Sequence, residues 1–288
     1  MKVFVNSGNV GTPVALELAR QGHDVSLGVR APKADAELDK LGIAQTPFDI
    51  SDENSMTVAL RGHEAFFSLT TLVENFIEAG TKAIQAAKTE GIQKIVRSSA
   101  QGAGPNAPIK LGRIHYEVEK VLEDSGIAFT VLRPANFMQN YLGFGTPESI
   151  KAQSAFYSPI DEAKVSPIDT RDISSVAVKV ILEPGHDGKH YDLTGGESLS
   201  NREIAELFSN ALGRKINYIS VPEAKATEGM TASGTPAWLV DVLSELNTIA
   251  KAGYLAAVKP DVELILKRPP ITFSAFINDH LVSFQGET

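Results

Sequence analysis

The sequence of 288 residues contains no cysteine. This absence excludes disulfide bonds, thiolate nucleophiles and cysteine-ligated metals, and it is consistent with a reducing compartment. No stretch approaches the ~20 consecutive apolar residues of a membrane span, and the apolar run at residues 3–5 is too short for a signal peptide. We therefore expect a cytoplasmic protein without a membrane partner.

Positive charge is scarce, because 27 Lys and Arg residues stand against 35 Asp and Glu residues and give a formal net charge of −8 at pH 7. The sequence also has no basic cluster. Nucleic acids and anionic membranes recruit proteins through a localised positive field. The charge pattern therefore predicts no nucleic-acid partner.

The sequence gives no support for a hydrolase nucleophile or for a metal site. The chain has no Gly-x-Ser-x-Gly elbow, the turn that presents the nucleophile of many hydrolases. His186 and His190 are four residues apart, the spacing of two metal ligands on one helix. Pro184, Gly185 and Gly188 deny this segment a helix, so we expect no metal site.

The chain does contain a repeated alternation of strand and helix patterns up to about residue 133. Runs rich in β-branched or aromatic residues predict strands at residues 3–6, 24–30, 43–48, 65–69, 94–98 and 129–133. A glycine follows the end of each of five predicted helices, at Gly22, Gly42, Gly62, Gly91 and Gly126. Repeated βαβ units of this kind predict an α/β fold with a doubly wound parallel sheet.

The regularity loosens after Pro134. We expect a loop-rich stretch at residues 146–167, a helix starting near Arg171, a strand at residues 190–193 and mainly helical segments beyond it. The chain therefore divides into a sheet domain, residues 1–133, and a smaller, mainly helical lid, residues 134–288. The strand near residue 191 could rejoin the main sheet, and the two parts would then interleave near residues 165–195.

The turn after the first predicted strand reads Asn6-Ser7-Gly8-Asn9-Val10-Gly11 and leads into a predicted helix. Backbone N–H groups at such a helix N-terminus hold a phosphate in dinucleotide-binding sheets. The full fingerprint has three glycines, whereas only Gly8 and Gly11 are present here. The motif predicts a phosphate-binding turn, and a plain βα turn whose glycines serve only the backbone stays open.

Arg30 ends the second predicted strand, where an NAD-specific site carries an acidic residue on the ribose 2′-hydroxyl. A guanidinium at this position, with Lys33 nearby, suits a 2′-phosphate. The two side chains therefore indicate NADP(H), against the alternative of a solvated surface arginine. Asp49, after the third predicted strand, could hold the adenine amino group or cap a helix.

Several short motifs carry a family resemblance. They are Gly8-Asn9-Val10-Gly11, Val29-Arg30, Arg97-Ser98-Ser99-Ala100, His115-Tyr116-Glu117-Val118-Glu119, Leu132-Arg133-Pro134, Phe137-Met138-Gln139-Asn140 and Arg268-Pro269-Pro270-Ile271-Thr272-Phe273. Through them the chain resembles the NmrA-like atypical short-chain dehydrogenases/reductases, especially the bacterial NAD(P)H:quinone oxidoreductase and triphenylmethane-dye reductase group. The resemblance implies a Rossmann-type sheet over residues 1–133, NADP(H) as cofactor and a small C-terminal substrate region. It also implies an alternative function, because some relatives are redox-sensing regulators that bind the cofactor without turnover.

The predicted cofactor-binding residues lie in or directly after the predicted strand ends, where open α/β sheets bind ligands. They are Ser7, Gly8, Asn9, Val10, Gly11, Arg30, Lys33, Asp49, Ile50, Ser68, Leu69, Thr70, Ser98, Ser99 and Pro134. For the two adjacent serines, ordinary turn chemistry is the alternative. Relatives carry Thr-Gly-Ala-Thr-Gly where this chain has the shorter Asn6-Ser7-Gly8, so we expect weakened but measurable cofactor binding.

His115 is the candidate catalytic residue. Tyr116 and Lys120 have the Tyr-x-x-x-Lys spacing of the wider superfamily, but the helical pattern places them with Glu119 and Glu123 on a solvent-facing side. Aligned with the family, the lysine position falls on His115 and the tyrosine position on Leu111. His115 could hydrogen-bond the nicotinamide ribose or donate a proton near neutral pH, and a core histidine is the alternative.

The missing tyrosine acid narrows the substrate. Hydride transfer to a simple ketone leaves a basic alkoxide that needs a proton donor, whereas a quinone yields a phenolate-like anion whose conjugate acid has a pKa near ~10. Phe137 and Tyr141, together with Met138 and Phe144, could line a slot for a flat aromatic or pack in a core. We expect an NADPH-dependent reductase of quinones or similar electrophilic aromatics, and a homodimer stays open.

Overall fold

The computed structural model describes residues 1–286 and divides the chain into two compact units. The first unit comprises Met1–Ala107, Leu111–Pro134 and Arg171–Asp192. The second comprises Pro108–Lys110, Ala135–Thr170 and the chain from Leu193 on. Each unit is thus assembled from segments that are separated in the sequence.

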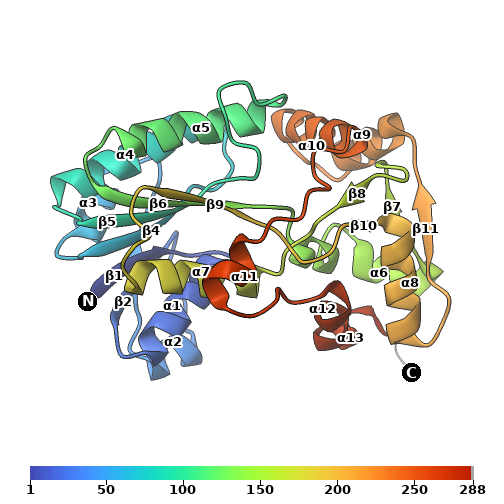
Figure 1. The fold of residues 1–288 in the computed structure, drawn as a ribbon, viewed down its shortest axis with the longest axis horizontal. Coiled ribbons are helices and arrows are strands. Elements are labelled where there is room, and N and C mark those ends of the chain that lie inside the picture. Colours follow the sequence, from blue (N-terminus) through green and yellow to red (C-terminus); the bar gives the residue numbers. More distant parts are fainter. Residues whose placement is uncertain (287–288) are drawn as a thin grey trace. The chain divides into compact units, whose positions relative to one another are not determined.

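The first unit is built on a seven-stranded sheet with the strand order β3-β2-β1-β4-β5-β6-β9 (Figure 1). Its strands are β1 (Lys2–Asn6), β2 (Asp24–Val29), β3 (Ala44–Pro47), β4 (Ala65–Leu69), β5 (Lys94–Ser98), β6 (Ala128–Pro134) and β9 (Lys189–Leu193). Strands β1 to β6 pair in parallel, and the direction in which successive strands are added reverses at β1 and β4. Doubly wound sheets bind their ligands at such a switch point. The predicted doubly wound, Rossmann-type sheet is therefore confirmed.

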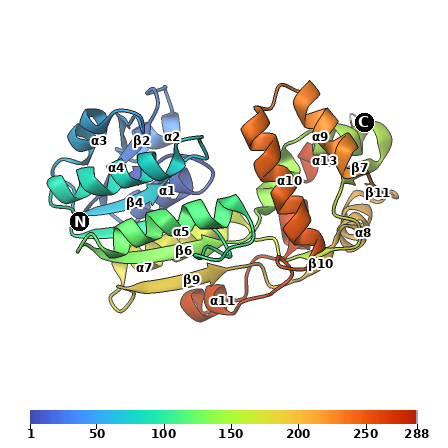
Figure 2. The ribbon, with the colours of Figure 1, turned by 90° about the horizontal axis from the view of Figure 1, so that it is seen from above.

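Helices cover both faces of this sheet, as Figures 1 and 2 show. One face carries α3 (Glu53–Leu60), α4 (Phe76–Thr89) and α5 (Lys110–Glu123), and the other carries α1 (Gly11–Arg20) and α7 (Thr170–Leu182), while α2 (Ala36–Lys40) joins β2 to β3. The core beneath α3 to α5 is apolar and includes Phe4, Met56, Phe66, Ile84, Val118 and Leu122. Each such side chain stabilises the fold by about 1.5–3 kcal/mol relative to an exposed one. The polar residues of the candidate site lie outside this core, at the carboxyl ends of the strands.

The five glycines predicted at helix ends all adopt positive φ angles, between +68° and +83°. This left-handed conformation closes a helix C-terminus, and glycine adopts it without steric cost. The predicted helix ends are therefore confirmed at Gly22, Gly42, Gly62, Gly91 and Gly126.

The second unit is mainly helical, with two small two-stranded sheets. Its elements are the 3₁₀ helix η1 (Met138–Leu142), α6 (Thr146–Gln153), β7 (Ala155–Ser158), β8 (Lys164–Val165), β10 (Leu199–Ser200), α8 (Asn201–Leu212), β11 (Asn217–Ser220), α9 (Glu223–Ala232), α10 (Ala237–Lys251), α11 (Asp261–Leu266), α12 (Phe273–Asp279) and α13 (Leu281–Phe284). Its core is rich in phenylalanine and contains Phe156, Phe208, Phe273, Phe276 and Phe284. Among residues 1–286, no helix combines the length and apolar character needed to cross a membrane.

The loop-rich stretch expected at residues 146–167 is wrong, because this segment holds α6, β7 and β8. Pro147 stands in the first turn of α6, where its fixed φ and missing N–H favour a helix start. Strand β7 pairs in parallel with β11, from Ala155↔Asn217 to Ser158↔Ser220. Pairing over such a sequence distance has no local signature, so the pattern of this segment alone does not predict these strands.

Gly11 occupies the tightest point of the turn between β1 and α1. A Cβ atom at this position would lie 1.6 Å from the carbonyl oxygen of Asn6. Because that oxygen belongs to the backbone, no side-chain movement relieves the clash. The close approach of α1 to the end of β1 therefore depends on glycine at this position.

Gly11→Ala should lower the free energy of unfolding by at least about 2 kcal/mol, because the turn must open to admit the methyl group. Chemical denaturation of both proteins measures this difference. Gly104→Ala is the matched control, since a Cβ atom there meets nothing within 4 Å, and its effect should stay within about 0.5 kcal/mol. Equal effects of the two substitutions would contradict the packing argument.

Candidate functional site

A groove of about 1020 Å³ lies at the carboxyl ends of β1 to β4 in the first unit. Its wall contains Asn6 and Ser7 at the end of β1, residues 28–31 at the end of β2, and Asp49, Ile50 and Ser51 after β3. This volume is at the upper end of small-molecule sites. We refer to it as the nucleotide groove, after the dinucleotide that the sequence analysis predicts for these strand ends.

The groove brings together six of the predicted cofactor-binding residues, namely Ser7, Arg30, Lys33, Asp49, Ile50 and Leu69. Gly8, Asn9, Val10 and Gly11 form the turn that continues from Ser7 into α1, and Ser68 and Thr70 flank Leu69 along the chain. Ser98, Ser99 and Pro134 lie at the ends of β5 and β6 and do not line the groove. The predicted residues therefore form two groups. One group lines the groove or continues directly from its wall, and the other lies at the ends of β5 and β6.

The turn before α1 presents backbone donors. The N–H of Thr12 bonds the carbonyl of Gly8 at 3.0 Å, and Val10, the N-cap residue, makes no side-chain cap. The N–H groups of Asn9, Val10 and Gly11 precede the first bonds within α1 and are not engaged by that helix. The turn therefore presents backbone N–H groups that α1 does not use, although it has two glycines where the full fingerprint has three.

Arg30 and Lys33 are exposed on the nucleotide groove. Their charged groups form no ion pair or side-chain hydrogen bond within residues 1–286. Asp49 is occupied differently, because its carboxylate accepts hydrogen bonds from the hydroxyl and N–H of Ser51, at 2.7 and 2.8 Å. These bonds, together with the charge of Arg30, lower the pKa of Asp49. The groove thus offers two cations that form no ion pair with a carboxylate in the described residues, although Asp49 lies near enough for the charge of Arg30 to act on it.

A buried polar cluster lies beside the groove residues in the first unit, between β5, β6 and α5. Ser99 Oγ donates to Glu119 Oε1 at 2.5 Å, and Arg133 Nε donates to the same carboxylate at 3.1 Å. His115 Nδ1 lies 3.3 Å from Ser99 Oγ. His190 extends this cluster, because its Nε2 lies 3.1 Å from Glu123 Oε1.

The expected solvent-facing position of Glu119 is wrong. Its side chain is fully buried, whereas Lys120 is partly exposed and pairs with Glu123 at 2.7 Å. Glu119 follows His115 by one helical turn and so shares its buried stripe. The sequence pattern placed a carboxylate outside because it did not reveal Arg133 as the compensating charge.

This hydrogen-bond pattern fixes the protonation of His115. Because the Ser99 hydroxyl donates to Glu119, it accepts from His115, and Nδ1 must carry the hydrogen. Burial and the positive charge of Arg97 lower the pKa of His115 to about 3. His115 is therefore neutral at physiological pH, and its Nε2, which has no partner in the described part of the chain, is a hydrogen-bond acceptor. This geometry favours a positioning role over that of a proton donor.

Arg97 is a buried residue whose role the sequence did not indicate. Its guanidinium is fully buried, donates to Thr70 Oγ1 at 3.2 Å and lies 5.8 Å from the ring centre of Phe76. Its Nε and one terminal nitrogen have no hydrogen-bond partner within residues 1–286. Burial lowers the pKa of Arg97 to about 10, which leaves it charged at neutral pH. Its charge adds to the larger effect of burial in lowering the pKa of His115. A charged residue inside a predicted core strand was the only available signal.

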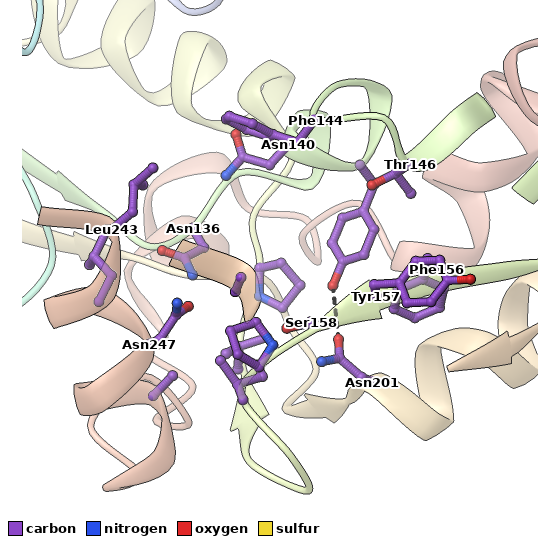
Figure 3. A pocket seen from close by; sticks show the side chains of 18 of the residues that line it. Asn136, Asn140, Phe144, Thr146, Phe156, Tyr157, Ser158, Asn201, Leu243 and Asn247 are labelled. Atoms are coloured by element: carbon purple, nitrogen blue, oxygen red, sulfur yellow. Dashed lines mark hydrogen bonds between the residues drawn. The ribbon is translucent and has the colours of Figure 1, made fainter. Parts of the chain in front are cut away.

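The second unit has a separate pocket of about 360 Å³, the second-unit pocket, shown in Figure 3. Both predicted substrate residues, Phe137 and Tyr141, line it, as does Phe144. Met138 instead packs in the aromatic core. Asn136, Asn140, Asn201 and Asn247 add amide groups to the wall, and the sequence pattern had singled out none of them as ligand-binding residues.

No group of three or more His, Asp or Glu side chains is arranged to hold a metal ion among residues 1–286. His186 and His190, four residues apart, have separate partners. His186 Nδ1 lies 2.8 Å from the hydroxyl of Tyr191, whereas His190 contacts Glu123. The two histidines therefore contact different side chains, one from the turn before β9 and the other from β9 itself.

The protonation of His115 should make stability depend on pH. The unfolded histidine titrates near the ordinary value of 6.5 and the folded one near 3, so between these values protons favour the unfolded chain. The stabilisation is complete above about pH 6.5 and declines at lower pH by up to ~1.4 kcal/mol per pH unit. Between pH 6 and 4, the free energy of unfolding should therefore fall more steeply in wild type than in His115→Gln.

Urea unfolding at several pH values provides the measurement. Tyr116→Phe, on the same helix, should retain the wild-type slope because it leaves His115 in place. Parallel pH profiles for wild type and His115→Gln would show that His115 is not held neutral by its surroundings.

Comparison with known proteins identifies a family and several proteins that share the fold. The model of the NmrA-like family matches residues 1–277. The chain is 35% identical over 281 residues to the NAD(P)H azoreductase of Xenophilus azovorans, an alignment that covers 96% of this chain and 97% of that protein. The NADPH complex of the NADPH-dependent quinone oxidoreductase from Escherichia coli superposes with a TM-score of 0.83, at 26% identity, over 98% of this chain and 100% of that one. The negative transcriptional regulator NmrA shares the fold, with a TM-score of 0.77 and 16% identity over 96% of this chain and 95% of that one.

Proposed function

The chain belongs to the NmrA-like family, and on this basis we propose that it is an NADPH-dependent reductase that transfers hydride to quinones or similar electrophilic aromatic compounds. The match confirms the resemblance that the sequence motifs indicated. The azoreductase and the quinone oxidoreductase among its relatives are both NAD(P)H-dependent enzymes by name. Oxidoreductase chemistry with a nicotinamide cofactor is therefore the class of activity to test first.

The observation that carries the proposal is a pair of exposed cations on the nucleotide groove that form no ion pair in the described part of the chain. Arg30 and Lys33 both line the groove, and neither charge is neutralised by an ion pair within residues 1–286. A 2′-phosphate would neutralise them, and the N–H groups of the turn at Asn9 to Gly11 would hold the pyrophosphate. The residues present thus fit NADPH, which supplies a hydride when bound.

The state of His115 supports a substrate that needs no strong acid. A neutral imidazole with an open Nε2 orients a hydroxyl group by accepting its hydrogen bond, but it has no proton to give from that atom. Lys120 is paired with Glu123 and Asp124 and makes no bond to Tyr116 in the described residues. A quinone meets this condition, because its reduced oxygen is a weak, phenolate-like base.

The second-unit pocket is the proposed substrate site. Its walls combine aromatic rings with asparagine amides, a composition suited to a flat aromatic molecule that carries hydrogen-bond acceptors. The ring of Tyr141 makes edge-to-face contacts with the rings of Phe156 and Phe273, at distances between ring centres of 6.0 and 5.0 Å. A rigid aromatic wall of this kind binds without losing much side-chain entropy.

A redox-sensing regulator is the second candidate function. Two features favour a regulator. Lys120 makes no bond to Tyr116 in the described residues, and the glycine turn is short. Both features weaken the case for catalysis. Such a protein would bind NADP(H) through the same groove and show no turnover.

Arg30→Ala should abolish a preference for NADPH over NADH. The substitution removes a charge-assisted contact of about 1.5–3 kcal/mol, equivalent to roughly ten- to a hundredfold in affinity for NADPH, and should leave NADH binding nearly unchanged. Calorimetric titration with both cofactors provides the measurement. Arg61→Ala is the control, because Arg61 is exposed, pairs with Glu90 and lies outside the groove. Equal wild-type affinities for the two cofactors would refute the assignment of Arg30.

NADPH oxidation should be observed with a panel of small quinones. His115→Ala should reduce kcat/KM by about tenfold, the value of one lost hydrogen bond to a positioned group, whereas Tyr116→Phe should change it by less than about twofold. Cofactor binding without turnover on the whole panel would select the regulator instead. Severe loss in a correctly folded Tyr116→Phe variant would show that Tyr116 supplies the acid.

A further inference from the structure

The second-unit pocket has no charged residue in its wall, although Asp, Glu, Lys and Arg make up 22% of the sequence. Its lining consists of aromatic and aliphatic side chains, prolines, hydroxyls and the four asparagines. An ion that enters such a site gives up hydration without meeting an opposite charge. The pocket is therefore suited to an uncharged ligand.

Asn201 is the most constrained polar residue of this pocket. Only 2% of its surface is exposed, and its Oδ1 accepts a hydrogen bond from the Tyr141 hydroxyl at 3.4 Å. Burial raises the pKa of Tyr141 above its ordinary value, so the hydroxyl keeps its proton and remains the donor. Asn201 Nδ2 has no hydrogen-bond partner among residues 1–286.

The backbone around Asn201 holds this amide in place. Asn201 is the first residue of α8, and Ser200 caps the helix through a reciprocal pair of bonds with Glu203, at 2.7 and 3.3 Å. Figure 3 shows the dashed bond from the Tyr141 hydroxyl to the oxygen of Asn201. The nitrogen is thus a fixed donor whose bonding capacity the protein leaves unused.

From the unused donor and the uncharged wall we infer that Asn201 is a specificity-determining residue of the substrate site. Its Nδ2 donates a hydrogen bond to an acceptor atom, such as a carbonyl oxygen, of a neutral, flat aromatic ligand. A buried amide without a partner is costly, so the ligand's acceptor restores a bond that folding leaves unmade. The inference rests on the proposed reductase function for the identity of the ligand as a substrate, but the binding it describes is independent of turnover.

The test measures ligand binding to the full chain without NADPH. The chain has one tryptophan, Trp238, on α10, the helix that also supplies Leu243, Leu246 and Asn247 to the pocket. Quenching of its fluorescence by 1,4-naphthoquinone and by the anionic 1,4-naphthoquinone-2-sulfonate reports binding of a neutral and a charged probe. Wild type should bind the neutral probe at least about tenfold more tightly, because the sulfonate has no counter-charge in the wall.

Two variants test the donor. Asn201→Leu removes it, and Asn201→Asp replaces it with an acceptor while adding a charge that the N-terminus of α8 tolerates. Each should weaken binding of 1,4-naphthoquinone by about five- to tenfold, as expected for one lost hydrogen bond. Asn210→Ala is the matched control, since Asn210 lies on the same helix, is exposed and is not part of the pocket wall, and it should change affinity by less than about twofold.

The outcomes separate this inference from the proposed function. Affinities of both folded Asn201 variants within about twofold of wild type, or equal wild-type affinities for the two probes, would overturn the inference even if quinones are turned over. Selective binding that depends on Asn201, without NADPH oxidation, would support it and overturn the reductase proposal. If Asn201→Leu fails to fold by circular dichroism, Asn201→Asp alone decides.

Discussion

The buried ion pair between Glu119 and Arg133 organises the polar interior of the first unit. The Glu119 carboxylate is fully buried, and Arg133, from β6, donates to both of its oxygens. Removal of one partner from such a pair leaves an uncompensated charge, at a cost of about 3–5 kcal/mol. Through Ser99 the same carboxylate determines which nitrogen of His115 carries hydrogen. A bond between a helix and a strand thus sets the chemical character of a side chain one helical turn away.

Much of the first unit could be predicted because its information is local. Strands of five or six residues bounded by glycine turns, such as β4 and β5, lie where their patterns indicate. The polar cluster was not predictable in the same way. Glu119 carries the pattern of a surface residue until Arg133 is known to face it, and these residues are neighbours only after β6 and α5 pack. Arg97 is similar, since its buried charge follows from tertiary packing and not from the strand pattern.

The candidate site shows the same division. The position of Arg30 relative to the glycine turn follows from the βαβ unit itself, and the groove therefore contains it, as it contains Lys33 and Asp49. Phe137 and Tyr141 line the second-unit pocket in agreement with their pattern. Asn201 was missed because Ser200 and Glu203 indicate only a helix start. That its amide lies in a pocket depends on η1, some sixty residues earlier, and no local signal encodes such a distance.

The segmented construction of the two units affects how the protein is made. The chain passes between them at five points, after Ala107, Lys110, Pro134, Thr170 and Asp192. Strand β9 therefore completes the sheet only after the ribosome has synthesised the whole segment from Ala135 to Thr170, which belongs to the other unit. Until then β6 is an open strand edge with unpaired backbone groups, and such edges recruit other nascent chains. In the interval between synthesis of β6 and of β9 the sheet therefore has an open edge at β6 that can pair with other chains.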